Sequence, residues 1–143
     1  QKGTWSQELT EDLGLTGTVD FTGEINDPAP LVARLDVFAQ PSRRDPFPLV
    51  VLEAMAMARP VVAFDVGGIA EQLGEAGVVV PAEDVDLMAK AVIGLLDDES
   101  ARRTLGDQAE ARVKEHWDVH VLFRPAIRRI LADVTAADHG STR

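Results

Sequence analysis

Short apolar runs alternate with helical segments along most of the chain. The helical segments begin near Pro30, cover 49–58 and 69–73, and continue from Ala82 to His116 with apolar residues three and four positions apart. A last helix is expected over 119–134. The runs that indicate strands are 19–23, 37–39, 60–65 and 76–81.

Two of these strands lack the alternation of apolar and polar residues that a half-exposed strand shows. PVVAFD (60–65) and AGVVVP (76–81) are apolar on both faces, so both faces must be covered. Helices between the strands supply that cover and complete βαβ units. The sequence therefore predicts an α/β fold, a parallel sheet flanked by helices, with a helical C-terminal end.

Length and composition fit one globular domain of 143 residues, 45% hydrophobic and 27% charged. We expect the domain to span 1–134 and a disordered polar tail to follow at 135–143. A net charge of −10 argues against a nucleic-acid surface, which needs a basic face. Since neither a membrane-spanning apolar run nor a secretory signal is visible, we expect a cytoplasmic protein.

Metal and thiol chemistry find little support. There is no cysteine, which excludes disulfides, thiolate nucleophiles and Cys-ligated zinc. His116 and His120 have the spacing of a metal pair, but no HExxH pattern accompanies them, so surface histidines are the simpler interpretation. A basic cluster in the last helix is either a solvated face or a contact with a membrane surface or acidic partner; it comprises Arg124, Arg128 and Arg129.

The candidate chemistry lies in two loops that follow strands. QPSRRDPFP (40–48) and DVGG (65–68) each lead into the N-terminus of a helix. Ligands of open parallel sheets bind beyond the carboxyl ends of the strands, and helix N-termini favour anions. The two loops therefore suggest a site for a phosphorylated ligand.

Glu53 is the one charged residue in the apolar segment 49–58, which we expect to be a buried helix. A buried carboxylate needs a partner. An internal salt bridge to Arg44 or Arg59 and a hydrogen bond to a ligand's hydroxyls are equally supported by this reasoning.

The prolines stiffen the loop before this helix. Pro48 falls where the first helical residue should be, a position that tolerates proline. Asp45 lies slightly too early to cap the helix, which favours a ligand-facing role.

The segment PSRRDPFPLVVLEAMAMARPVVAFDVGGIAEQL (41–73) resembles the signature of the family 4 retaining glycosyltransferases, also called glycosyl transferases group 1. These are GT-B enzymes, built from two Rossmann-like domains that face each other across a cleft. LGLTGTVDFTGEI (13–25) and GVVVPAEDVDLMAKAVIGLLDD (77–98) are similar to further segments of the family. The resemblance extends over about residues 9 to 117 and implies a Rossmann-like donor domain without its first strands.

The resemblance also implies roles in binding a nucleoside-diphosphate sugar. Glu53 would hold the ribose hydroxyls, and Asp45 would contact the donor sugar near its anomeric carbon as the catalytic acidic position. Neither a cofactor nor a metal is implied. Backbone groups would face the sugar and diphosphate at Phe47, Pro48, Leu49 and Val50, and the nucleobase at Gly23, Glu24 and Ile25.

This sequence departs from the family pattern in two ways. Asp45 stands where the family has glutamate, and Pro48 replaces glycine. The basic pair that neutralises the diphosphate and the N-terminal acceptor domain have no match. We therefore expect the donor-binding part of a hexosyltransferase with an unidentified acceptor, inactive as this chain alone. The alternative is a non-catalytic nucleotide-sugar-binding or interaction module of the same fold; a GT-B phosphorylase or phosphosugar-binding epimerase is less well supported.

Overall fold

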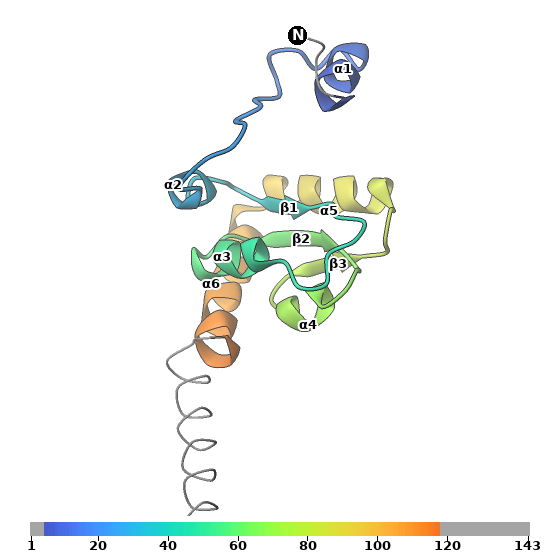
Figure 1. Cartoon of the computed structure of the whole chain (residues 1–143). Coiled ribbons are helices and arrows are strands. Elements are labelled where there is room, and N and C mark those ends of the chain that lie inside the picture. The colour runs from blue at the N-terminus through green and yellow to red at the C-terminus, as the bar shows by residue number, and fades with distance from the viewer. Residues whose placement is uncertain (1–4, 118–143) are drawn as a thin grey trace, which may run out of the picture.

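The computed structural model describes residues 5–117, which form an α/β fold around a small parallel sheet (Figure 1). The elements in chain order are α1 (Trp5–Asp12), α2 (Ala29–Val32), β1 (Phe38–Gln40), α3 (Leu49–Ala56), β2 (Val61–Phe64), α4 (Ile69–Leu73), β3 (Val78–Val80), α5 (Val85–Asp97) and α6 (Glu99–His116).

The three strands are parallel and lie in the order β1-β2-β3. Ala39 pairs with Val62, and Val62 pairs with Val78 on its other side. Because the strands are parallel and in register, their carboxyl ends share one edge of the sheet. The predicted parallel sheet with helical cover is confirmed.

The central strand β2 is buried on both faces, and all four of its residues lie in the core. Val61 and Ala63 pack with buried side chains of α3, α4 and α6, whereas Val62 and Phe64 pack with Met88 and Leu95 of α5. Figure 1 shows the same layers, with α5 on one side of the sheet and α3, α4 and α6 on the other. The absence of inside-outside alternation in 60–65 therefore predicted a strand covered on both faces correctly.

Helix α3 ends in a turn that brings it against α6. Arg59 N–H donates to Ala54 O and Ala58 N–H to Met55 O, both at 3.0 Å, which is the Schellman pattern. Ala58 takes the left-handed conformation (φ 54°) that this pattern requires. A Cβ on Gly106 of α6 would lie 2.3 Å from Ala58 O, so only glycine allows α6 to approach this closely.

The prediction of a strand at 19–23 is wrong. These residues are exposed and have no regular structure, and they lie in the long connection between α1 and α2 (Figure 1). A strand exists through hydrogen bonds to a neighbour, and within residues 5–117 this segment has no strand beside it. The β-branched and aromatic composition of VDFTG is therefore not sufficient for a strand.

The helical C-terminal half agrees with the sequence. Asp84 Oδ1 accepts from Leu87 N–H and Asp98 Oδ1 from Ala101 N–H, each at 2.9 Å, so both long helices begin with a side-chain cap. Within residues 5–117, none of the helices combines the length and apolarity needed to cross a bilayer. The predicted helix 119–134, its basic cluster, His120 and the tail lie outside the described residues.

Candidate functional site

The loops after β1 and β2 meet at the carboxyl edge of the sheet. Gly68 N–H donates to Pro46 O at 2.8 Å. Gly67 has φ 55°, and a Cβ there would lie 2.0 Å from Asp45 O and 2.9 Å from Pro46 Cα. The two glycines thus permit backbone-to-backbone contact between the loops, and the structure brings together the two segments in which the sequence placed the site.

The loop after β3 reaches the same edge. Arg43 Nε lies 3.6 Å from Glu83 Oε2, and both side chains are largely exposed. Glu83 has φ 64°, a left-handed conformation that is uncommon for glutamate. A solvated pair of this kind contributes little stability, but it shows that all three loops after the strands border one surface.

Asp45 is half-buried and forms a turn of its own backbone. Its Oδ1 accepts a hydrogen bond from Phe47 N–H at 3.2 Å. This Asx turn fixes the carboxylate four residues before the first residue of α3, and within residues 5–117 no side chain caps the helix. The sequence reasoning was right that Asp45 lies too early to be the cap.

Pro48 is the N-cap of α3 rather than its first residue, which corrects the prediction by one position. Its ψ of 114° is extended, and Leu49 is the first helical residue. Leu49 and Val50 begin the helix, so their N–H groups have no carbonyl to bind within it. Together with the missing side-chain cap, these groups leave the N-terminus of α3 available to an anion.

Glu53 is exposed, so the prediction that it lies in a fully buried helix is wrong. Helix α3 buries only one face, formed by Val51, Ala54 and Met55. Leu49 is 67% exposed and lies one turn before Glu53, so the two residues share the face that points away from the core. Apolar residues thus occupy positions on both faces, and composition alone could not show which one faces water.

The salt bridge considered for Glu53 is absent from the described part of the chain. Arg59 instead donates to Leu35 O and Met57 O, each at 3.0 Å. Arg44 is exposed and forms no ion pair within residues 5–117. Glu53 therefore presents an uncompensated carboxylate to solvent on the first turns of α3, beside the open N-terminus of the helix.

Gln72 and Trp117 also contact the loop, and the sequence analysis missed both. Gln72 Nε2 donates to Pro48 O at 3.0 Å in a buried environment. The rings of Phe47 and Trp117 meet edge to face, with centroids 5.2 Å apart. The only signal in the sequence was a glutamine between apolar residues of a short helix, which is weak evidence for such a role.

The residues proposed to line a nucleobase lie elsewhere. Gly23, Glu24 and Ile25 are exposed in the connection between α1 and α2, and Ile25 is 38% exposed. Within residues 5–117 no hydrogen bond joins them to the loops after β1 and β2. Their role stays a prediction.

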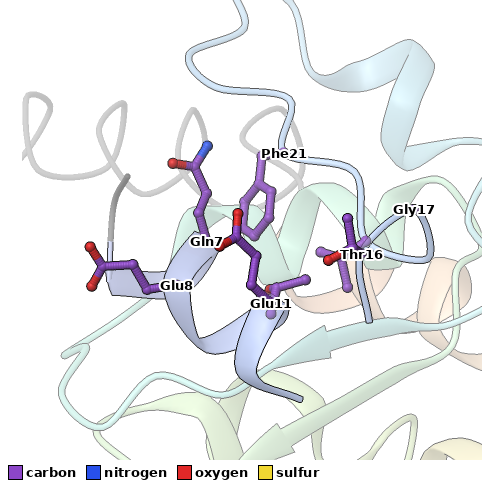
Figure 2. Close-up of a pocket in the computed structure, with 8 residues that line it drawn as sticks. Gln7, Glu8, Glu11, Thr16, Gly17 and Phe21 are labelled. Atoms are coloured by element: carbon purple, nitrogen blue, oxygen red, sulfur yellow. The ribbon is translucent and has the colours of Figure 1, made fainter. Parts of the chain in front are cut away.

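A hollow of about 550 Å³ lies between α1 and the turn that follows it (Figure 2). Figure 2 shows Gln7, Glu8 and Glu11 projecting from α1, with Thr16 and Phe21 on the following segment. Its two carboxylates would repel a diphosphate, and the residues that line it include no cation. The carboxyl edge of the sheet is the better candidate, because Arg43 and Arg44 lie in its loop and the N-terminus of α3 faces it.

Comparison with known proteins identifies the family of the chain. Residues 2–98 match the family model described as "Glycosyl transferases group 1". The chain is 37% identical over 119 residues to a phosphatidyl-myo-inositol mannosyltransferase of Mycolicibacterium smegmatis. The match covers 78% of this chain and 31% of that protein. The chain is also 42% identical over 104 residues to a D-inositol 3-phosphate glycosyltransferase of Corynebacterium diphtheriae, covering 69% and 24% of the two chains.

Solved structures show the same fold. A sucrose-phosphate synthase from Thermosynechococcus elongatus superposes with a TM-score of 0.83 and 31% identity over 92% of this chain and 34% of its own. Anabaena HepE, solved in complex with UDP, superposes with a TM-score of 0.82 and 27% identity, over 90% of this chain and 37% of its own. The predicted partial Rossmann-like domain of the GT-B fold is confirmed, and the chain spans about a third or less of these proteins.

Proposed function

Because the chain belongs to the glycosyl transferases group 1 family, we propose that it is the donor-binding part of a retaining glycosyltransferase. It binds a nucleoside-diphosphate sugar whose sugar is passed to an acceptor with its anomeric configuration kept. The observation that carries the proposal lies at the edge where the loops meet. There, within residues 5–117, the exposed Glu53 has no ion-pair partner and follows a helix N-terminus without a side-chain cap.

Each group has a distinct task. Glu53 accepts hydrogen bonds from the ribose hydroxyls, and the N–H groups of Leu49 and Val50 face the diphosphate. As the nucleoside diphosphate leaves, its growing negative charge is stabilised by this helix end. Asp45 orients the donor sugar with the carboxylate oxygen that its turn leaves free. No resident metal takes part, so a chelator leaves donor binding unchanged.

Titration calorimetry on the 143-residue chain tests the ribose contact, with UDP as the first probe because HepE was solved with UDP. Hydrogen bonds to a charged group contribute about 1.5–3 kcal/mol, so Glu53→Gln should weaken UDP binding roughly 10- to 100-fold. Glu75→Gln is the matched control, since Glu75 is also exposed but precedes β3 at the opposite edge of the sheet.

A second ligand makes the test specific to the ribose. UDP that lacks the 2′ and 3′ hydroxyls should bind the wild type as weakly as UDP binds Glu53→Gln, and Glu53→Gln should bind both ligands alike. Equal UDP affinity of Glu53→Gln and wild type would show that the ribose assignment is wrong. A wild-type chain that binds none of UDP, GDP and ADP would contradict donor binding itself.

One observation favours a second candidate, a non-catalytic nucleotide-sugar-binding module. The Asp45 carboxylate is already engaged by Phe47 N–H, and Pro48 lacks an N–H to offer. In a transferase that contains this chain, Asp45→Glu combined with Pro48→Gly separates the two functions. A large gain in sugar transfer supports the binding module, and unchanged robust transfer supports the enzyme. The 143-residue chain alone should show no transfer.

A further inference from the structure

Gln72 is a polar side chain that the fold buries completely. Its Nε2 donates to Pro48 O, but within residues 5–117 its Oε1 has no hydrogen-bond partner. A buried amide oxygen without a partner destabilises the fold, and a methionine of similar length would avoid that cost. Packing of the core therefore does not explain glutamine at this position, whereas the bond to the loop does.

The loop that receives this bond cannot hold itself in place. Pro46 and Pro48 have no N–H groups, and the Asx turn is local to Asp45 and Phe47. Within residues 5–117, two hydrogen bonds join the loop to α4 and the residue before it, beside the exposed Arg43–Glu83 ion pair and the ring contact of Phe47 with Trp117. Gly68 N–H donates to Pro46 O, and Gln72 Nε2 donates to Pro48 O.

Helix α4 is in turn held by α6. Arg112 donates from Nε to Gln72 O at 2.8 Å and from an Nη to Glu71 O at 2.7 Å. The guanidinium lies against Gly74, where a Cβ would be 2.6 Å from Arg112 Cζ. Gln72 thus joins a helix anchored in the core to the backbone of the loop that precedes α3.

We propose that Gln72 is a positioning residue for donor binding, an inference that rests on the proposed function of the same site. Its amide and Val51 N–H both donate to the carbonyl of Pro48, and the bond from Gln72 ties the first turn of α3 to α4 and helps to set the place of Asp45. A donor then meets N–H groups that are already oriented, and binding does not have to order the loop.

Hydrogen exchange in the wild-type chain is the first test and needs neither a variant nor a donor. The side-chain amide protons of Gln72 should exchange more slowly than those of Gln108, an exposed glutamine of α6. Equal exchange rates for the two side chains would overturn the proposal, because the bond to Pro48 would then be absent in solution.

Gln72→Met, with Gln108→Met as the matched control, is the second test. Backbone exchange at Phe47, Val51 and Gly68, whose N–H groups are hydrogen-bonded at the loop, should rise about tenfold through local opening, while exchange in β2 and the melting temperature stay near wild type. An unchanged loop, or exchange that rises equally throughout the chain, would assign Gln72 to the core alone and overturn the proposal. The control should alter neither region.

Donor affinity completes the test and separates this proposal from the proposed function. UDP-glucose should bind Gln72→Met about tenfold more weakly than the wild type, because the loop must then be ordered on binding. Unchanged affinity despite a loosened loop would overturn the positioning role. If the wild type binds none of UDP, GDP and ADP, donor binding fails as a function, whereas the exchange measurements still show whether Gln72 holds the loop.

Discussion

Gly67→Ala should both destabilise the domain and disturb the candidate site. The left-handed backbone at Gly67 costs a non-glycine residue about 1–2 kcal/mol. The added Cβ would also lie 2.0 Å from Asp45 O, where real Cβ contacts essentially never fall below 3.0 Å. Since the obstacle is backbone, the loops must separate, and the Gly68–Pro46 hydrogen bond, worth about 1 kcal/mol, is lost.

Together these terms predict that Gly67→Ala lowers the free energy of unfolding by about 2–3 kcal/mol. For a chain of this size, the melting temperature should fall by roughly 8–12 °C in thermal unfolding followed by circular dichroism. Gly94→Ala is the matched control, because Gly94 lies exposed within α5 with no atom near its added Cβ. The Gly94→Ala substitution should raise the free energy of unfolding by about 1 kcal/mol, because alanine has the higher helix propensity. A Gly67→Ala chain that melts at or above the wild-type temperature would refute the contact between the two loops.

Two further predictions concern helix ends, both measured by urea unfolding. Ala58→Gly should raise the free energy of unfolding by about 1 kcal/mol, because glycine adopts the left-handed turn at the end of α3 without strain; no gain would show that Ala58 is not left-handed in solution. Asp98→Ala removes the cap that accepts from Ala101 N–H and should cost about 1 kcal/mol. Ser100→Ala, on the same turn and exposed, should stay within about 0.5 kcal/mol of the wild type.

The sequence predicted well those parts of the fold that depend on local pattern. Helix 69–73 was placed at its observed bounds, and the strands found at 38–40, 61–64 and 78–80 lie within about two residues of their expected positions. Each of these segments carries its own signal, either an apolar run or a helical period. The parallel order followed because helices separate the strands.

What the sequence could not show depends on which face of an element meets another. Glu53 was expected to be buried because its neighbours are apolar. However, the apolar Leu49 on the same face is itself exposed to solvent, so apolar neighbours do not show that the face is buried. The strand at 19–23 failed because pairing is a property of two strands and cannot be seen in one. Gln72 was overlooked because its partner, the Pro48 carbonyl, is 24 residues away in the chain.

The edge-to-face contact between Phe47 and Trp117 gives the chain a built-in optical probe. The chain has two tryptophans, and Trp5 is 77% exposed on α1, whereas the indole nitrogen of Trp117 is buried and its ring meets Phe47 of the loop. Indole emission depends on the polarity around the ring. The two tryptophans should therefore differ in the wavelength of maximum emission and in how strongly a soluble quencher reduces their fluorescence. With Trp5→Phe, the remaining fluorescence would come from Trp117 alone and would follow the motion of the loop in real time, without any label.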